Sequence, residues 1–314
     1  MKRLLLLLLC ALCTSQAFAG PLLDRLRERR EASQDDALEQ DDDTGSRLAL
    51  PAGAKVLHDV AYGSDAKQSM DVYLPANPAN APVIFMVHGG AWRTGDKAMS
   101  RVVNNKVARW LPRGIIFISV NYRLLPKADP LQQAEDVGRA LATAQGKARE
   151  WGANPDAFVL MGHSAGAHLV SLINSPPERT LALGARPWLG TVSLDTAAMD
   201  IVTVMQNRHF RFYDKAFGSD PAFWQATSPM QQLNRQAPPL FAVCSSTRPD
   251  HPCDGTQTFA DKAHDMGLRV EMLPQALKHS QINENLGQPG AYTTAVERFM
   301  AGLSPALRTR LGEP

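Results

Sequence analysis

The sequence has little charge imbalance and few cysteines. Its 33 Lys and Arg residues nearly match its 31 Asp and Glu residues, so the formal net charge is only +2. That balance offers no attraction for nucleic acid or for an anionic membrane surface. The spacing of Cys, His and acidic residues fits no metal site, and no glycine-rich loop fits a phosphate or a dinucleotide. We therefore expect no metal, no cofactor and no nucleic-acid partner.

Composition also excludes several structural classes. The chain has 314 residues, of which 44% are hydrophobic and 20% charged, with 22 Gly and 22 Pro. These values exclude collagen, coiled coil and wholesale disorder, and the length can bury a large core. The sequence predicts one domain, because α/β folds often reach this size without splitting.

The first 19 residues have the three parts of a secretory signal peptide. Met1-Lys2-Arg3 is basic, Leu4–Cys13 is apolar, and Ala17-Phe18-Ala19 is a small-x-small cleavage site. The apolar run is shorter than the roughly 20 residues that a membrane span needs. A lipoprotein signal is disfavoured because Cys10 and Cys13 each follow a Leu. We expect cleavage after Ala19 and a periplasmic or secreted protein that has no stable membrane association.

Cleavage would leave a neutral chain with two cysteines. It removes Lys2 and Arg3, so the formal charge becomes +2 − 2 = 0, and it also removes Cys10 and Cys13. Cys244 and Cys253 then remain in an oxidising compartment, which favours a disulfide between them. Two separately buried thiols are the alternative, since pairing also depends on geometry.

Charge and periodicity divide the rest of the chain. Residues 20–50 are dense in charges of both signs and predict a solvated leader, either a spacer or an interaction tail. Residues 51–305 carry the pattern of a folded domain, and residues 306–314 are expected to form a tail. The sequence does not indicate an oligomeric state.

Hydrophobic patterning in residues 51–305 predicts strands alternating with helices. Such alternation is typical of a mostly parallel sheet covered on both faces, here with an antiparallel hairpin at one edge. The expected strands are Lys55–Gly63, Gln68–Leu74, Pro82–Val87, Gly114–Val120, Phe158–Met161, Leu189–Leu194, Leu240–Cys244 and Val270–Leu273. The expected helices are Leu131–Trp151, one beginning at Ala167–Ile173, Gly255–Met266 and Ala291–Leu303.

Residues 196–238 interrupt this alternation. This stretch holds six of the 21 aromatic residues: Phe210, Phe212, Tyr213, Phe217, Phe223 and Trp224. An aromatic insertion above the carboxyl ends of the strands is suited to a lid or a substrate pocket. A packed subdomain without substrate contact is the alternative.

Gly162-His163-Ser164-Ala165-Gly166 carries the first chemical signal. It follows an expected strand and opens an expected helix, which is the context of a nucleophile elbow. The two glycines permit a tight turn that exposes the hydroxyl of Ser164 above the sheet. The motif predicts that Ser164 is a nucleophile.

His88-Gly89-Gly90-Ala91-Trp92 carries a second, independent signal. A loop of this kind can present backbone N–H groups to an oxyanion without side chains in the way. We expect the N–H groups of Gly90 and Ala91, with that of Ala165, to form the oxyanion hole. His88 is interpreted as a support of the loop rather than a catalytic base.

The chain resembles the α/β-hydrolases, specifically carboxylesterases of the hormone-sensitive-lipase, feruloyl-esterase-like and kynurenine-formamidase-like groups. The resemblance covers about Lys55–Leu303 and rests on the two motifs above, on Asn121-Tyr122-Arg123-Leu124 and on the segment His279-Ser280-Gln281-Ile282-Asn283. It implies an α/β-hydrolase fold and a triad in the chain order Ser, acid, His. Of the eight histidines, His279 alone follows the last expected strand and is the candidate base.

Three carboxylates are candidates for the acid. Asp250 is preferred, because in the resembled families the acid precedes a Gln by about seven residues, and Asp250 and Gln257 have this spacing. Asp254 is the second candidate and is also suited to cap the helix that follows. Asp195 is the third, because some α/β-hydrolases carry the acid one strand earlier. A disulfide between Cys244 and Cys253 would close a ten-residue ring around Asp250 and hold it in place.

These assignments imply acyl transfer through a covalent intermediate. The expected function is an exported serine carboxylesterase acting on small or aryl esters, with Trp92, His163 and Asp195 as candidate substrate contacts. Trp92 is also expected to pack. An arylformamidase-like amidase is the alternative, and a binding protein on a hydrolase scaffold without catalysis is a third hypothesis.

Overall fold

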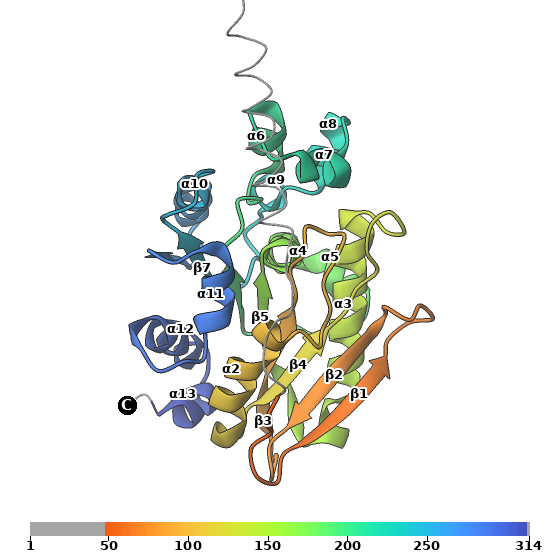
Figure 1. The fold of residues 1–314 in the computed structure, drawn as a ribbon, viewed down its shortest axis with the longest axis vertical. Helices are drawn as coiled ribbons and strands as arrows, with labels where there is room; N and C mark the ends of the chain where they lie inside the picture. The colour runs from red at the N-terminus through yellow and green to blue at the C-terminus, as the bar shows by residue number, and fades with distance from the viewer. Residues whose placement is uncertain (1–47, 313–314) are drawn as a thin grey trace, which may run out of the picture.

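The computed structural model describes residues 48–312 (Figure 1). The predicted signal peptide and all but the end of the predicted leader lie outside the described residues. Within the described part of the chain, no helix combines the length and apolar character that a bilayer span requires.

An eight-stranded sheet forms the centre of the domain. Its spatial order is β1-β2-β4-β3-β5-β6-β7-β8, with β2 antiparallel to β1 and β4 and every other pair parallel. The expected mostly parallel sheet with an antiparallel edge hairpin is confirmed. The strands are β1 Lys55–Ala61, β2 Ser69–Leu74, β3 Ala81–Val87, β4 Ile116–Val120, β5 Ala153–His163, β6 Gly190–Leu194, β7 Leu240–Ser245 and β8 Val270–Gln275.

Helices cover both faces of this sheet (Figure 1). They are α2 Ser100–Trp110, α3 Pro130–Lys147, α4 Ala165–Asn174, α5 Pro177–Ala182, α6 Ile201–Gln206, α7 Arg211–Phe217, α8 Pro221–Ala226, α9 Pro229–Gln232, α10 Pro252–Asp265, α11 His279–Asn285, α12 Ala291–Ala301 and α13 Pro305–Leu311. Short 3-10 segments follow α2 and α3.

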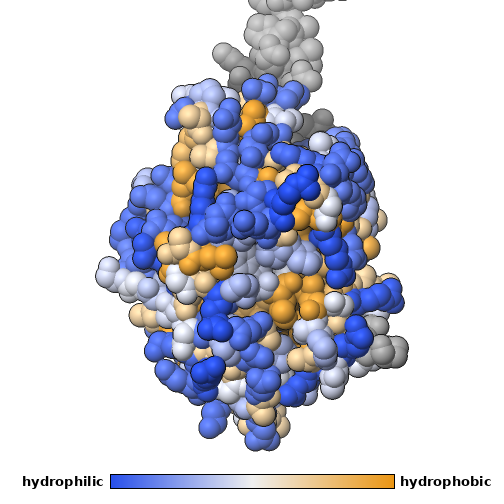
Figure 2. Space-filling view, turned by 180° about the vertical axis from the view of Figure 1, so that it is seen from behind, coloured by the Kyte–Doolittle hydropathy of each residue, from blue (hydrophilic) through white to orange (hydrophobic). Residues whose placement is uncertain are grey.

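The side chains of β3 show why two helical layers are needed. Val83 and Phe85 pack into a core with α3 and α4, whereas Ile84 and Met86 pack into a second core with α2, α12 and α13. Successive strand residues point to opposite faces, so a continuously apolar strand must be covered on both. The face seen in Figure 2 is mostly hydrophilic, with hydrophobic residues in separate patches.

Helices α2 and α13 are among the elements that the sequence-based expectations did not include. Helix α2 was not predicted, although its buried side chains recur at helical spacing: Val102, Val103, Lys106, Val107 and Trp110. The expected tail at 306–314 contains most of helix α13, whose Leu307 and Leu311 are buried in the second core. A short apolar helix at the chain end gives too few turns for its periodicity to stand out.

Residues 196–238 form the four short helices α6–α9 between β6 and β7. In Figure 1 helices α6, α7 and α8 lie together at the top of the view, above α4. The segment lies where the sequence placed an insertion, and its buried aromatic side chains pack into the same core as α3 and α4.

Lys106 is a fully buried lysine of α2 whose amine contacts α11. Its Nζ donates to the backbone oxygen of Asn283 at 2.7 Å, to Asn283 Oδ1 at 2.8 Å and to Arg101 O at 3.2 Å. Burial lowers the pKa of Lys106 to about 7. The contact ties α2 to α11, the helix that begins at His279.

Lys106 predicts a specific dependence of stability on pH. An unfolded lysine has a pKa near 10.4, so between about pH 7 and pH 10 the unfolded chain binds more protons and wild-type stability rises with pH. Lys106→Met should lose this rise. We expect its free energy of unfolding, relative to wild type, to fall by about 2–5 kcal/mol across that range. Denaturant unfolding at several pH values measures it. The exposed Lys55→Met is the control, and parallel curves for Lys106→Met and wild type would contradict the prediction.

Candidate functional site

The nucleophile elbow has the predicted form. Strand β5 ends at His163, Ser164 has φ 57° and ψ −119°, and helix α4 begins at Ala165. A positive φ is costly for a residue with a side chain and persists only where the surroundings fix it. Here the Ser164 N–H donates to Leu194 O at 3.0 Å, which joins the turn to the end of β6.

Glycines let the HGGAW loop and the nucleophile elbow pack closely at Ser164. A Cβ on Gly166 would lie 2.3 Å from Val87 O, and a Cβ on Gly89 would lie 2.8 Å from Ser164 Cβ. Both distances are shorter than side chains tolerate, so the two motifs can pack together only with glycine at these positions.

The HGGAW loop lies against the elbow. Ala91 and Trp92 have φ of 46° and 61°, and the Gly90 carbonyl accepts the N–H groups of Arg93 and Thr94 at 2.9 Å. Ala91 and Ala165 line the same cavity as Ser164, whereas Gly90 is not among the residues that line it. The placement suits Ala91 and Ala165 as oxyanion donors. The role predicted for Gly90 stays a prediction.

The side chain of His88 packs against its own loop, as a support would. Its ring is fully buried, stacks on Tyr122 with centroids 4.6 Å apart, and places Nδ1 2.7 Å from Gly89 O. Burial lowers the pKa of His88 to about 4, so it is neutral at neutral pH. It does not line the cavity at Ser164.

The carboxylate that meets His279 is Asp195. Nδ1 of His279 donates to Asp195 Oδ2 at 2.6 Å, and Asp195 Oδ1 accepts the N–H of Ser245 at 2.7 Å. Asp195 directly follows β6, has φ 57° and is fully buried. His279 is the first residue of α11 and lines the Ser164 cavity together with Asp195.

The prediction of Asp250 as the acid is wrong for this structure. Both carboxylate oxygens of Asp250 accept from Arg248, at 2.9 Å to Nε and 2.5 Å to Nη2. The guanidinium of Arg248 stands between Asp250 and the histidine. Asp254 is not the acid either, and it lies in the first turn of α10 rather than at its N-cap, which is His251. Asp195, the third candidate, therefore takes this place.

Sequence reasoning missed Arg248. Its Nη1 lies 3.0 Å from Asp195 Oδ2 and 3.1 Å from His279 Nδ1, and its side chain is 7% exposed. No motif marks an arginine two residues before the preferred acid. The only available signal was its position inside the ring that the two cysteines close.

Burial and charge act in opposite directions on this pair. Burial alone would raise the pKa of Asp195, but the guanidinium of Arg248 and the hydrogen bond from His279 outweigh it and hold that pKa well below its usual range. Burial alone would lower the pKa of Arg248, but the negative charges of Asp195 and Asp250 outweigh burial and raise this pKa above its usual value. Both groups are therefore charged at neutral pH.

His163 does not contact the cavity that the candidate substrate contacts were expected to line. It is buried, and its Nε2 lies 3.1 Å from the backbone oxygen of His279, with ring centroids 4.5 Å apart. Burial and, as a smaller cause, the charge of the neighbouring His279 hold the pKa of His163 well below its usual range. As a neutral donor it holds the backbone of the histidine segment, so its placement argues against a substrate contact.

Trp92 joins the HGGAW loop to the insertion. Its indole N–H donates to His168 Nδ1 at 3.2 Å, and His168 Nε2 donates to Thr227 O at 2.8 Å. Its ring centroid lies 4.8 Å from that of Phe217 and 5.7 Å from that of Tyr213. Trp92 therefore packs as expected and also lines the cavity, together with Phe212 and Tyr213 of α7.

Two cavities share Ala197 and Tyr213 in their linings. The one at Ser164 measures about 20 Å³, little more than a single water molecule needs. The other measures about 280 Å³ and lies between the insertion and the start of α10. Its lining includes Asp200, Thr203, Asn207, His209, Asp250 and His251. Within the described residues, no group of three or more His, Cys, Asp and Glu side chains is arranged to hold a metal ion.

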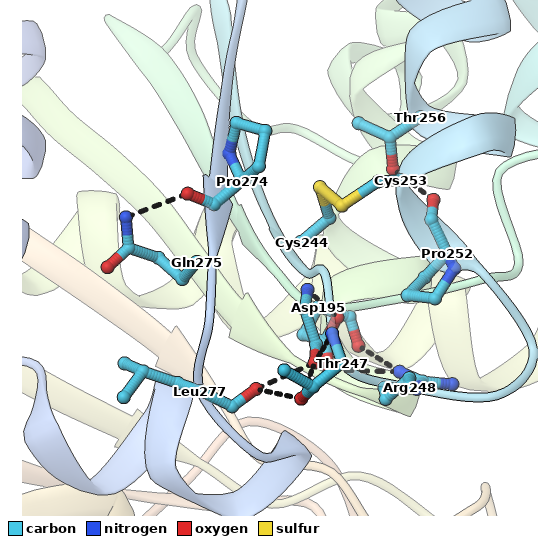
Figure 3. Close-up of a disulfide and its surroundings, with 11 residues drawn as sticks. Asp195, Cys244, Thr247, Arg248, Pro252, Cys253, Thr256, Pro274, Gln275 and Leu277 are labelled. Atoms are coloured by element: carbon cyan, nitrogen blue, oxygen red, sulfur yellow. Dashed lines mark hydrogen bonds and ion pairs between the residues drawn. A yellow bond between two sulfur atoms is a disulfide. The ribbon is translucent and has the colours of Figure 1, made fainter.

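The predicted disulfide between Cys244 and Cys253 is present, with Cα atoms 5.2 Å apart. It joins the end of β7 to the first turn of α10, and in Figure 3 Asp195, Thr247 and Arg248 lie below it. The ring holds Arg248 and Asp250 rather than the acid itself. Ser245 Oγ also donates to Leu277 O at 2.6 Å, which ties this loop to the segment before His279.

Sequence comparisons agree with this architecture. The BD-FAE family matches residues 70–182. The esterase LipQ of Mycobacterium tuberculosis is 27% identical over 67% of this chain and 53% of its own length. The isoprenylcysteine alpha-carbonyl methylesterase ICME of Arabidopsis thaliana is 26% identical over 70% of this chain and 55% of its own length. The chain thus spans about half the length of these two curated relatives.

Solved structures share the fold over most of the chain. A truncated carbohydrate esterase from gut microbiota has a TM-score of 0.71 at 17% identity and covers 83% of this chain and 100% of its own. Esterase B from Lactobacillus rhamnosis has a TM-score of 0.67 at 20% identity and covers 93% and 96%. The protein has the α/β-hydrolase fold. The comparisons confirm its resemblance to α/β-hydrolases of the carboxylesterase type.

Removing the disulfide should lower stability and loosen the loop that carries Arg248. For a ring of this size the chain-entropy relation gives about 2–3 kcal/mol. We expect the double variant Cys244→Ala/Cys253→Ala to lose that amount in denaturant unfolding. Reduced wild type should resemble it. Equal unfolding midpoints for the variant and the oxidised wild type would show that the ring contributes nothing.

Proposed function

We propose that the protein is a serine carboxylesterase that hydrolyses small or aryl carboxylic esters through an acyl-enzyme intermediate. The observation that carries the proposal is the 2.6 Å hydrogen bond from His279 to Asp195 in a cavity that Ser164 also lines. Ser164 occupies a strained elbow, and both relatives described above bear esterase names. Nucleophile, buried acid and base (Ser164, Asp195 and His279) follow one another in the chain order known for this fold.

The hydrogen bond to Asp195 fixes which nitrogen of His279 acts. With its proton on Nδ1, the ring presents the Nε2 lone pair as the acceptor for the Ser164 hydroxyl proton. Ser164 Oγ then attacks the ester carbonyl, and the imidazolium that forms is stabilised by the buried Asp195. The N–H groups of Ala91 and Ala165 stabilise the oxyanion.

Collapse of the tetrahedral intermediate releases the alcohol. His279 returns its proton to the leaving oxygen, which leaves the acyl group on Ser164. Water then enters, gives a proton to His279 and attacks the acyl carbon. The second collapse frees the carboxylic acid and restores the hydroxyl of Ser164.

Cavity size supports a short acyl group. The space beside Ser164 is about 20 Å³, enclosed by Trp92, Phe212 and Tyr213. The adjoining cavity of about 280 Å³ shares Tyr213 with it and offers room for the alcohol or aryl part. A bulky acyl chain would have to displace buried aromatic rings, which costs packing free energy.

Hydrolysis of p-nitrophenyl esters from acetate to decanoate tests the proposal. We expect kcat/KM to be highest for acetate and to fall by at least about tenfold from butyrate to octanoate, because the lost contacts of a displaced ring cost more than about 1.4 kcal/mol. Ser164→Ala should abolish turnover and also labelling by a fluorophosphonate.

Three outcomes would contradict this proposal. A preference for decanoate would contradict the short acyl chain. Turnover of N-formyl-arylamines but not of the matched esters would favour the amidase hypothesis. Folded wild type that neither turns over any of these substrates nor takes up the fluorophosphonate would favour a binding protein.

A pair of isosteric variants tests the identity of the acid. Asp195→Asn should lower kcat by about 10³–10⁴, since an amide cannot hold the required tautomer and charge. Asp250→Asn should lower kcat by less than about 30-fold, because it contacts Arg248 and not His279. Steady-state kinetics on p-nitrophenyl acetate compares them. Equal losses in the two variants, or a larger loss for Asp250→Asn, would contradict the assignment.

We also propose that the protein is exported. The sequence of residues 1–19 and a disulfide beside the site support this proposal, because disulfides persist in oxidising compartments. Cell fractionation of the full chain, followed by N-terminal sequencing, should find a protein that begins at Gly20. Recovery of the uncut chain in the cytoplasm would contradict export.

A further inference from the structure

The buried guanidinium of Arg248 contacts both carboxylates near His279. Nη1 donates to Asp195 Oδ2 at 3.0 Å and to Asp195 O at 3.3 Å, while Nε and Nη2 donate to the two oxygens of Asp250. Only 8% of the residue is exposed. Such a contact pattern fixes both the position and the plane of the guanidinium.

Arg248 and His279 share one acceptor atom. Nδ1 of His279 lies 2.6 Å from Asp195 Oδ2 and 3.1 Å from Arg248 Nη1. Arginine has no lone pair to offer and stays protonated, so two donors converge on Oδ2 when Nδ1 carries its proton. If Asp195 moved away, Nη1 would donate to Nδ1 instead. The ring proton would then sit on Nε2, and His279 would be unable to accept from Ser164.

Asp250 fixes the position of the Arg248 guanidinium from the side opposite to Asp195. Its bidentate contact holds Nε and Nη2, which leaves Nη1 for Asp195. The loop that carries both residues is closed by the disulfide between Cys244 and Cys253. The guanidinium of Arg248 therefore lies between His279 and Asp250, the residue first expected to be the acid.

The cluster also balances charge. Asp195, Asp250 and Arg248 carry a net charge of −1 beside neutral His279, and this becomes 0 when the ring is protonated. Other titratable groups near the cluster include His163 from β5, Tyr213 from α7 and Tyr292 from α12. Burial lowers the pKa of His163 and raises the pKa of both tyrosines, so all three are neutral. The charge of Lys106 also lowers the pKa of His163.

We propose that Arg248 is a positioning residue of the triad, which holds the Asp195 carboxylate in place and sets the tautomer and basicity of His279. Asp250 acts through Arg248 as its anchor. This inference rests on the proposed function, because it assigns Arg248 a role in the same reaction. A purely structural ion pair would instead affect folding and leave the pH profile unchanged.

The test compares Arg248→Gln, Arg248→Lys and Asp250→Asn with wild type. For Arg248→Gln we expect kcat to fall by about 10–100-fold with KM changed less than about threefold, because the lost contact acts on the reacting groups. In the profile of kcat/KM against pH, the acid limb of this variant should move about one pH unit higher. Removing one positive charge leaves a net charge of −2, which favours the imidazolium to higher pH.

The conservative variants separate positioning from folding. Arg248→Lys keeps the charge but not the fork, so its acid limb should stay near that of wild type while kcat is only partly restored. Asp250→Asn should shift the limb downward, because Arg248 is then less compensated. Arg186→Gln, which breaks an ion pair with Asp156 on the surface, is the matched control. It should leave both parameters unchanged.

Proton NMR gives a second readout that does not depend on turnover. Wild type should show a low-field resonance of the Nδ1 proton of His279, and Arg248→Gln should shift or broaden it. An acid limb and a resonance both unchanged in folded Arg248→Gln would overturn the inference. If Arg248→Gln fails to fold, Arg248→Lys decides, because wild-type kcat in that variant would also overturn it.

The proposed function can be contradicted independently of this inference. A wild-type protein that neither hydrolyses esters nor takes up a fluorophosphonate would overturn the esterase proposal. The NMR comparison would still show whether Arg248 sets the proton position on His279.

Discussion

The site depends on one buried carboxylate. Asp195 directly follows β6 and accepts from the N–H of Ser245, from the ring of His279 and from the guanidinium of Arg248. A fully buried charge is stable only when its lone pairs are paired, so these three donors must all be in place when the domain folds. Because they come from the end of β7, the loop after β7 and the start of α11, one side chain sets the position of three segments.

The sheet supplies the frame for this arrangement. Strands β5, β6 and β7 are parallel neighbours, so their carboxyl ends meet at one edge and bring Ser164, Asp195 and Ser245 together. Backbone bonds from Ser164 N to Leu194 O and from Asp195 N to Val243 O continue the strand contacts beyond the sheet. The strained φ of Ser164 and Asp195 is therefore held by packing and hydrogen bonds on both sides.

The sequence predicted the elements whose signals are local. Strand β5, the elbow and the HGGAW loop are read from consecutive residues, and the disulfide was predicted from the two cysteines that would remain after the proposed cleavage. The acid was mispredicted because the spacing of Asp250 and Gln257 describes a loop length, whereas the contact to His279 depends on where two loops meet in space. Arg248 decides that contact, and its partners Asp195 and Asp250 belong to loops after different strands, so no local pattern reveals it.

An acid after β6 changes what the loop after β7 must do. That loop no longer supplies the carboxylate, yet it still faces His279, and an uncompensated Asp250 there would add a second negative charge beside the ring. Arg248 neutralises Asp250 and at the same time donates to Asp195, so a single guanidinium makes both acidic residues compatible with a histidine that gains and loses a proton in the proposed reaction. The disulfide across this loop fixes the guanidinium, because a small displacement of Nη1 toward Nδ1 would exchange the proton position on which the proposed general-base catalysis depends.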